Sequence, residues 1–221
     1  MTQRYRPYRA VLTGAAGGIG AALAKELLPQ AEYMILVGRN RAALETLRAQ
    51  LDPARIHLIE GDLTQAATLD AIATLAEQLG GFNLLINNAG SNDFHAFETQ
   101  SEDAIRSMLE INLLAPMLLS RRLIPLMKKQ LHAQIVNIGS VMGSIGFPGF
   151  SVYCGTKAGL QGFTQALRRE LADTSIDVRY FAPRATRTAI NSDAANAMNC
   201  ELRTGEDMPE AVARSFIAFL N

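Results

Sequence analysis

Short apolar runs rich in β-branched residues alternate with segments of helical period, and this alternation limits the fold more than any other feature of the chain. A parallel strand covered by helices on both faces is a continuous apolar run, and each parallel crossover needs a helix. The pattern therefore predicts an α/β fold with a doubly wound, mostly parallel sheet and helices on both faces. We predict six strands, at Arg9–Thr13, Tyr33–Val37, Arg55–Ile59, Asn83–Asn87, Gln134–Ile138 and Asp177–Phe181.

The helical segments between these strands carry apolar residues three and four positions apart, as expected of helices that cover a sheet. A longer helix is predicted from near Ser101 to near Lys129, with kinks at Pro116 and Pro125. Another is predicted to start close to Phe150 and to continue through Leu171. No repeat, low-complexity tract or Gly/Ser linker divides residues 1–221, so we expect a single domain.

The segment at about 184–207 is polar and has only a weak helical pattern, which predicts a mobile substrate loop or lid. A short amphipathic helix is expected to follow it, from Pro209 through Phe219.

The charges balance, with 21 Lys plus Arg and 21 Asp plus Glu, so no net field favours nucleic acid as a partner. Cys154 and Cys200 form no CxxC pair and have no His cluster beside them, so we expect reduced thiols and no metal site. No segment is long and apolar enough for a secretory signal or a membrane span. We therefore expect a cytoplasmic protein with a small-molecule partner and no membrane partner.

Thr13-Gly14-Ala15-Ala16-Gly17-Gly18-Ile19-Gly20 follows the first predicted strand and leads directly into a helix. Glycines allow a sharp turn and a close approach to a diphosphate, and the helix N-terminus offers free N–H groups with partial positive charge. A glycine-rich run alone is equally a flexible turn. The strand before it and the helix after it favour a Rossmann-type dinucleotide site.

Arg39 lies at the end of the second predicted strand, about 20 residues after the glycines, where a dinucleotide fold selects its ribose. A guanidinium cannot accept from the 2′-hydroxyl of NAD but pairs well with a 2′-phosphate, so NADP is favoured and NAD stays possible. The alternative is a solvated arginine in a surface loop.

Asp62 follows the third predicted strand, in Gly61-Asp62-Leu63-Thr64. Its carboxylate is able to accept from the exocyclic amine of adenine. It is equally suited to cap the next helix, or Thr64 caps that helix instead.

Tyr153 and Lys157 lie four residues apart, on one face of the predicted helix. A phenol has a pKa of about 10, and an adjacent buried cation in a partly dry site is expected to lower this pKa toward neutrality. Such a pair is common on helix surfaces. Ser140, however, ends the fifth predicted strand at the carboxyl edge, where open α/β sheets bind ligands, although it is also suited to a turn.

Together these motifs resemble the short-chain dehydrogenase/reductase family in its single-domain form, and the resemblance spans nearly the whole chain. The elements that carry it are Thr13–Gly20, Asp62, Asn87-Asn88-Ala89-Gly90, Asn112, Ser140, Tyr153 and Lys157. They occur in the family's order and close to its spacing, and their joint occurrence is more specific than any one of them.

The resemblance implies four catalytic residues. Tyr153 would be the acid for reduction and the base for oxidation, Lys157 would hold the nicotinamide ribose and lower the tyrosine pKa, and Ser140 would orient the carbonyl. Asn112 would anchor a water that links Lys157 to solvent; otherwise Asn112 satisfies backbone groups near a helix kink.

The resemblance also implies a cofactor site, in which Thr188 would meet the carboxamide and Asn88 to Gly90 would line the cleft, although the Asn-Asn pair also suits a turn. The expected cofactor-binding residues are Gly14, Gly18, Ile19, Gly20, Arg39, Asp62, Leu63, Asn88, Ala89, Gly90, Tyr153, Lys157 and Thr188.

Two positions depart from the family's pattern. Arg184 follows Pro183 where the family usually has glycine, which is expected to put a bulky charge beside the nicotinamide. Members commonly continue into a seventh strand at a tetramer interface, and nothing after Asn221 supplies one, so truncation or a different oligomer is expected.

The sequence thus predicts an NADP(H)-dependent oxidoreductase that transfers hydride between nicotinamide and a carbonyl or secondary alcohol, as a homo-oligomer (dimer or tetramer). Two alternatives stay open: a catalytically silent dinucleotide-binding regulator or scaffold, and an epimerase or dehydratase that uses the same tyrosine. Phe94, Met142, Ile145, Phe147 and Phe150 are either core residues or an apolar substrate pocket.

Overall fold

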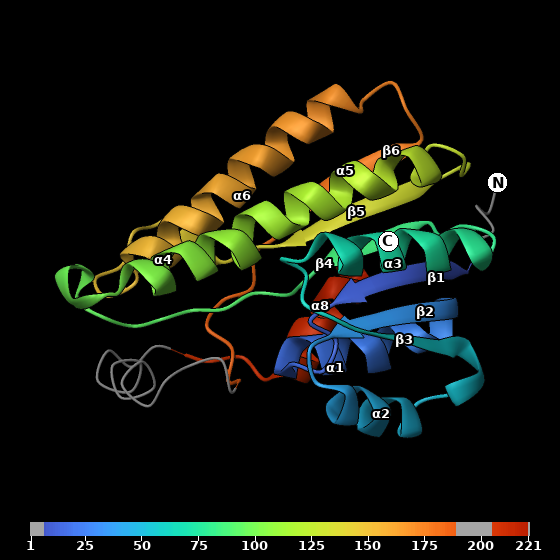
Figure 1. The fold of residues 1–221 in the computed structure, drawn as a ribbon, viewed down its shortest axis with the longest axis horizontal. Coiled ribbons are helices and arrows are strands. Elements are labelled where there is room, and N and C mark those ends of the chain that lie inside the picture. Colours follow the sequence, from blue (N-terminus) through green and yellow to red (C-terminus); the bar gives the residue numbers. More distant parts are fainter. Residues whose placement is uncertain (1–6, 189–204, 221) are drawn as a thin grey trace.

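A computed structural model describes residues 7–188 and 205–220, and six parallel strands form its single sheet (Figure 1). The strands are β1 (Tyr8–Thr13), β2 (Ala31–Gly38), β3 (Ile56–Glu60), β4 (Leu84–Asn87), β5 (Ala133–Ile138) and β6 (Ile176–Phe181). Each predicted strand is confirmed, with ends that differ by at most two residues. The order is β3-β2-β1-β4-β5-β6, so the direction of winding reverses between β1 and β4. The doubly wound prediction is therefore confirmed.

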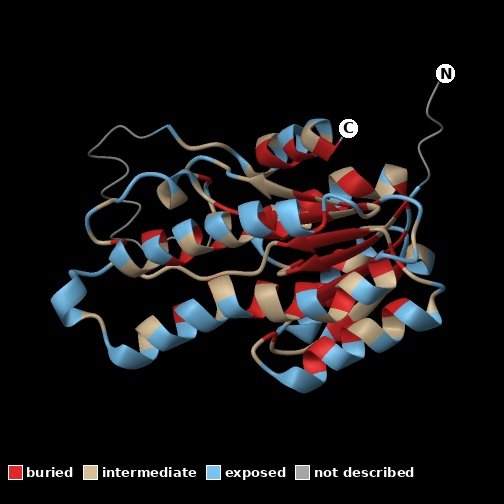
Figure 2. Ribbon diagram, turned by 90° about the horizontal axis from the view of Figure 1, so that it is seen from above, coloured by how far each residue is buried: buried red, intermediate tan, exposed pale blue. Residues whose placement is uncertain are grey.

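Helices cover both faces of the sheet, and Figure 2 shows the buried strands enclosed between them. One apolar cluster joins the sheet to α1 (Gly18–Leu27), α2 (Arg41–Ala49) and α8 (Pro209–Leu220). A second cluster joins the opposite face to α3 (Ala66–Gln78), α5 (Ala115–Met127) and α6 (Ser151–Glu170). Two apolar layers thus explain why the strands are apolar on both sides.

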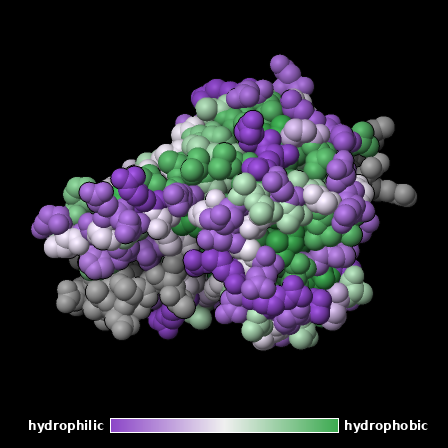
Figure 3. Space-filling view, viewed as in Figure 1, coloured by the Kyte–Doolittle hydropathy of each residue, from purple (hydrophilic) through white to green (hydrophobic). Residues whose placement is uncertain are grey.

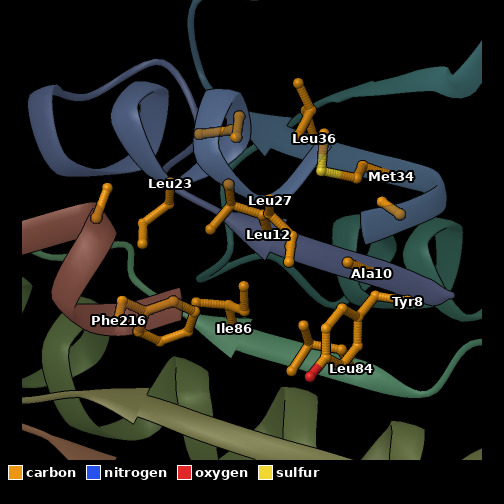
Figure 4. Close-up of a cluster of buried hydrophobic side chains, with 14 of the residues drawn as sticks. Tyr8, Ala10, Leu12, Leu23, Leu27, Met34, Leu36, Leu84, Ile86 and Phe216 are labelled. Atoms are coloured by element: carbon orange, nitrogen blue, oxygen red, sulfur yellow. The ribbon is translucent and has the colours of Figure 1, made fainter. Parts of the chain in front are cut away.

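Side chains of β1 alternate between these two layers. Ala10 and Leu12 belong to the cluster with α1, whereas Val11 belongs to the cluster on the other face. Figure 4 shows Leu12 beside Leu27 of α1. Leu12 and Leu27 are fully buried, and burying such a side chain contributes about 1.5–3 kcal/mol.

The long helix predicted from near 101 to near 129 consists of three pieces. These are α4 (Glu102–Leu109), a π-helical segment (Glu110–Leu114) and α5. The Ala115 N–H bonds the Glu110 carbonyl, five residues back. Pro116 explains the wider turn, since it has no N–H and its ring would clash with the Asn112 carbonyl in an α-helix. The predicted kink at Pro116 is thus a π segment just before it, while Pro125 lies inside α5.

The helices predicted near Phe150–Leu171 and Pro209–Phe219 are confirmed as α6 and α8. In the part of the chain that the structure describes, no helix has the length and apolarity needed to cross a bilayer. Hydrophobic and hydrophilic residues alternate in patches on the face shown in Figure 3.

Candidate active site

A cavity of about 510 Å³ opens at the carboxyl edge of the sheet, beside the point where the strand order reverses. Its size is typical of a small-molecule site. The walls come from the start of α1, the loops after β4 and β5, the first turns of α6 and the segment after β6. Residues lining it include Ile19, Asn88, Gly90, Ser91, Asn92, Ile138, Ser140, Met142, Ile145, Phe147, Phe150, Tyr153, Lys157, Arg184 and Thr188.

The glycine loop between β1 and α1 is closely packed. Gly14 has a φ of +63°, which favours glycine, and a Cβ on Gly20 would lie 2.1 Å from the Gly14 carbonyl oxygen. α1 begins at Gly18, so the N–H groups of Gly18, Ile19 and Gly20 form its first turn. The loop therefore presents helix N–H groups at the cavity, as an anion site requires.

The loop after β4 is joined to this glycine loop. The N–H groups of Asn88 and Ala89 donate to the Thr13 hydroxyl at 3.0 and 3.1 Å, and the Asn88 amide donates to the Thr13 and Gly14 carbonyls at 3.0 and 3.1 Å. A Cβ on Gly14 would lie 2.8 Å from the Ala89 Cα atom. Asn88 thus joins the two loops and lines the cavity, whereas Asn87 is buried and donates to the side chains of Ser120 and Asn137.

Thr188 and Gly18 form the opposite side of the same cleft. A Cβ on Gly18 would lie 2.7 Å from the Thr188 Cγ2 atom, so only glycine admits this approach. The Thr188 Oγ1 atom is buried and has no hydrogen-bond partner among the residues described. A buried hydroxyl of this kind needs a partner. The free helix N–H groups and this hydroxyl fit a dinucleotide with a diphosphate and a carboxamide.

Arg39 follows the carboxyl end of β2, and Asp62 follows the carboxyl end of β3. Arg39 is exposed and makes no ion pair within residues 7–188 and 205–220. The Asp62 carboxylate accepts from the Thr64 N–H at 2.9 Å, and Leu63 is buried in the core. α3 is capped by Gln65 without a side-chain bond. The alternative in which Asp62 or Thr64 caps this helix therefore does not hold, because the helix begins later, after Gln65.

Ser140, Tyr153 and Lys157 meet in the cavity. Lys157 is 6% exposed, and its ammonium donates to the Ile138 carbonyl at 3.0 Å and lies 5.7 Å from the centre of the Tyr153 ring. The Ser140 hydroxyl accepts from the Met142 N–H at 3.1 Å. The end of β5 and the first turns of α6 thus bring the three predicted side chains together.

The pKa of Tyr153 differs from the expected direction. Burial raises the pKa of Tyr153 to about 12, and a hydrogen bond with the Ser140 side chain lowers it in part. Burial also lowers the pKa of Lys157 to about 8. The predicted lowering toward neutrality is thus wrong for this structure, because the ammonium lies over the face of the ring and bonds a carbonyl, so burial prevails.

Asn112 lies in the π segment and is 1% exposed. Its side-chain oxygen accepts from the Ser91 N–H at 2.8 Å, and its amide donates to the Ser91 carbonyl at 2.8 Å and to the Thr156 hydroxyl at 3.1 Å. A Cβ on Gly90 would lie 2.9 Å from the Asn112 oxygen and 3.7 Å from the Lys157 ammonium. The Asn112 side chain therefore ties the loop after β4 to α6 beside Lys157.

Tyr180 is a site residue that the sequence reasoning missed. Its hydroxyl accepts from the Ser140 N–H at 3.3 Å and donates to the Lys157 carbonyl at 3.2 Å. A Cβ on Gly139 would lie 2.0 Å from the Tyr180 ring, and one on Gly143 would lie 2.6 Å from its hydroxyl. The sequence signal for this role of Tyr180 is weak: it consists of the glycines on both sides of Ser140 and a tyrosine near the end of the sixth strand.

Arg184 lines the cavity, but its charge is compensated. Its guanidinium donates to the Asp207 carboxylate at 2.8 and 3.3 Å, and this bond raises the pKa of Arg184. The expected bulky charge beside the site is therefore half of an ion pair. Asp207 also forms a parallel bridge with Thr186. The rest of the loop expected at 184–207 and Cys200 lie outside the described residues, which contain Cys154 as a buried free thiol.

Comparisons with known proteins agree with this geometry. The family model described as short chain dehydrogenase matches residues 9–199. Nodulation protein G of Rhizobium sp. (strain N33) is 39% identical over 176 residues, which are 79% of this chain and 71% of that protein. An uncharacterised oxidoreductase of Staphylococcus aureus (strain USA300) is 30% identical over 204 residues, which are 92% of this chain and 88% of that protein.

Solved structures share the fold over almost the full chain. A short-chain dehydrogenase from Streptomyces avermitilis superposes with a TM-score of 0.86 at 29% identity, covering 97% of this chain and 84% of that one. A short-chain dehydrogenase/reductase from Burkholderia phymatum, solved in complex with NAD, has a TM-score of 0.87 at 23% identity, covering 98% and 86%. The second likeness concerns the fold alone.

Proposed function

The chain belongs to the short-chain dehydrogenase family and is an oxidoreductase, and on that premise we propose that it uses NADP(H) to interconvert a carbonyl and a secondary alcohol of a small molecule. One observation carries the proposal. The hydroxyls of Ser140 and Tyr153 and the buried ammonium of Lys157 line one cavity with the glycine loop.

A bound nicotinamide supplies the hydride for reduction and accepts it in oxidation. The residues of this chain handle the proton and the oxygen. Ser140 donates a hydrogen bond to the carbonyl oxygen and orients it. Tyr153 gives its phenolic proton to the same oxygen during reduction. In the reverse direction the Tyr153 phenolate removes the proton from the alcohol hydroxyl. Both hydroxyls line the cavity, and a Ser140 hydrogen bond already acts on the tyrosine.

Lys157 is proposed to hold the ribose next to the nicotinamide and to favour the ionised form of Tyr153. Its pKa of about 8 keeps the ammonium mostly charged near neutral pH. A positive charge nearby lowers the free energy of a phenolate. Asn112 is proposed to support a water path from Lys157, which its place beside Gly90 and Lys157 favours.

The remaining predicted residues are proposed to bind the dinucleotide. Gly14, Gly18, Ile19 and Gly20 cradle the diphosphate, and the Thr188 hydroxyl meets the carboxamide. At the adenosine end, Asp62 and the Leu63 backbone contact the adenine, and Asn88 to Gly90 line the cleft. The segment at about 184–207 is proposed as the substrate loop.

NADP is proposed over NAD because Arg39 is an exposed cation without an ion pair among the described residues, at the end of β2. Such a guanidinium suits a 2′-phosphate. NAD stays an alternative, since the Burkholderia phymatum protein of the same fold was solved with it. We further propose a homo-oligomer in the cytoplasm. A silent regulator is not favoured, because the side chains needed for turnover share one cavity.

Turnover is tested by the loss of reduced-nicotinamide absorbance with a panel of ketones. Tyr153→Phe removes only the hydroxyl, so turnover should fall about a hundredfold or more while cofactor binding, measured by calorimetry, is kept. A silent panel with measurable cofactor binding would support the regulator instead.

Cofactor choice is tested by Arg39→Asp. The ratio of NADPH to NADH affinity should fall by about ten- to a hundredfold, as expected for loss of a charged hydrogen bond. The nearby exposed Arg41→Asp, which loses only a pair with Glu45, is the control and should leave the ratio unchanged. An unchanged ratio in Arg39→Asp would contradict the assignment of Arg39.

A further inference from the structure

A small apolar cluster next to Tyr153 belongs to neither core of the sheet. Phe150 and Cys154 are buried in it, and Phe94, Met142, Phe147 and Tyr153 pack against them. The ring centres of Phe94 and Phe150 are 5.0 Å apart, and those of Phe150 and Tyr153 are 6.2 Å apart. These rings therefore extend from Tyr153 and belong to neither of the two apolar layers that cover the sheet.

Part of this cluster lines the cavity, next to apolar residues that are exposed to water. Met142, Phe147 and Phe150 line the cavity together with Ile145, which is 68% exposed, and Val141, which is 41% exposed. Apolar side chains gathered at a cavity and left in contact with water indicate a binding surface, because a ligand that covers them gains the free energy of their burial.

The backbone holds the aromatic wall of the cavity, formed by Met142, Ile145, Phe147 and Phe150, in place. Gly149 has a φ of +78°, and a Cβ there would lie 2.2 Å from the Phe94 ring. The His95 N–H donates to the Gly149 carbonyl at 3.0 Å, and the Phe150 N–H donates to the Phe147 carbonyl at 3.1 Å. Two loops distant in sequence thus fix the aromatic wall before any ligand arrives, which lowers the entropy that binding costs.

The charged side chains that line the cavity already have hydrogen-bond or ion-pair partners. Of the described residues that line it, the basic ones are Lys157 and Arg184, and none is a carboxylate. Lys157 donates to the Ile138 carbonyl, and Arg184 is paired with Asp207. A cationic substituent would find no partner there, and a carboxylate would have to compete with Asp207.

We propose that the aromatic wall formed by Met142, Ile145, Phe147 and Phe150 binds an uncharged alkyl or aryl substituent of the substrate, next to its carbonyl. This inference rests on the proposed hydride transfer and narrows its substrate to apolar ketones and the matching secondary alcohols. The carbonyl end meets Ser140 and Tyr153, while the apolar end displaces water from the wall.

A series of ketones with one carbonyl chemistry tests the proposal. With NADPH, kcat/KM should rise from butan-2-one through hexan-2-one to octan-2-one, by up to about fourfold for each methylene buried. The charged ketone 4-oxopentanoate should be the poorest substrate. If the enzyme reduces 4-oxopentanoate or butan-2-one at least as well as octan-2-one, the proposal is overturned.

Two matched variants locate the effect. Ile145→Asp places a carboxylate on the wall, and Leu131→Asp places one at a position that is 66% exposed and does not line the cavity. The ratio of kcat/KM for octan-2-one to that for butan-2-one should fall about tenfold in Ile145→Asp, since an isolated charge is costly to cover with an alkyl chain. The ratio should stay as in the wild type in Leu131→Asp. An unchanged ratio in Ile145→Asp would refute the proposed location.

Binding separates this proposal from hydride transfer itself. NADP⁺ and a ketone are both oxidised and cannot react, so calorimetry with the wild-type protein measures binding alone. Saturable binding that is tighter for octan-2-one than for butan-2-one, and weakened in Ile145→Asp, supports the wall even if no ketone is reduced. Reduction without any chain-length preference in binding would leave the proposed function standing and overturn this inference.

Discussion

Replacing Lys157 by methionine should make the protein more stable near neutral pH while impairing it as an enzyme. Lys157 is 6% exposed, and burial lowers its pKa from 10.5 to about 8. That difference corresponds to about 3 kcal/mol of free energy spent on holding an ammonium inside the protein. Methionine fills a similar volume without a charge.

The net gain is smaller than this cost, because the variant also loses the hydrogen bond to the Ile138 carbonyl. A charged hydrogen bond contributes about 1.5–3 kcal/mol, so Lys157→Met should unfold with a free energy about 0–2 kcal/mol higher than the wild type near pH 7. Ketone reduction should fall strongly, since the proposed support for Tyr153 is gone.

The pH dependence gives the sharper test. Above about pH 8 the native lysine of the wild type loses its proton, while the unfolded lysine keeps it up to about 10.5. The unfolded state then binds more protons, so wild-type stability rises with pH in this window. Between about pH 7 and about pH 9.5 the advantage of Lys157→Met should shrink by about 2 kcal/mol.

Urea unfolding followed by circular dichroism at several pH values measures this difference. Subtracting the variant from the wild type cancels the titrating groups that do not contact Lys157, such as Tyr33, whose pKa burial raises to about 12. Lys25→Met, at an exposed lysine, is the control and should show no such change with pH. A difference between Lys157→Met and wild type that stays constant with pH would refute the reasoning.

Two further substitutions test the scaffold of the site. Tyr180→Phe keeps the ring against Gly139 but leaves the Ser140 N–H and the Lys157 carbonyl without this partner. The free energy of unfolding should therefore fall by about 1–2 kcal/mol, measured by urea unfolding, and kcat should fall by up to about tenfold in steady-state assays. No loss in either would mean that the hydroxyl does not position these residues. Gly20→Ala puts a Cβ 2.1 Å from a backbone oxygen, so it should lower the free energy of unfolding by about 2–4 kcal/mol and weaken dinucleotide binding. The control Gly162→Ala has open space around it on α6, so it should keep binding and raise the melting temperature. A Gly20→Ala protein as stable as wild type would count against this packing.

The strands were predictable because both faces of the sheet are covered. Each strand is then a continuous apolar run such as Met34–Val37, and the helical segments between the runs are what parallel crossovers require. The meeting of Ser140 and Tyr153 was also predictable, since carboxyl ends of parallel strands share one edge. These inferences need only the period of the sequence.

Other features depend on contacts between distant segments. The π segment follows from Pro116, but its wider turn could not be told from a kink without the neighbouring helices. The support from Tyr180 depends on two glycines more than thirty residues earlier in the chain. The raised pKa of Tyr153 depends on where the Lys157 ammonium points, which a spacing of four residues does not determine.

The widened turn between α4 and α5 has a consequence for how this protein tolerates changes of length. Each α-helical residue advances the helix by about 100°, so one extra residue in the turn shifts the angular phase of everything on one side relative to the other. α4 is thereby set toward α6, while α5 is set toward α3. Deleting one residue from 110–114 would rotate the two halves out of phase and turn Asn112 away from Ser91. The protein should therefore not tolerate insertions or deletions between α4 and α5, whereas the exposed loop at Gly80, after α3, has room for them.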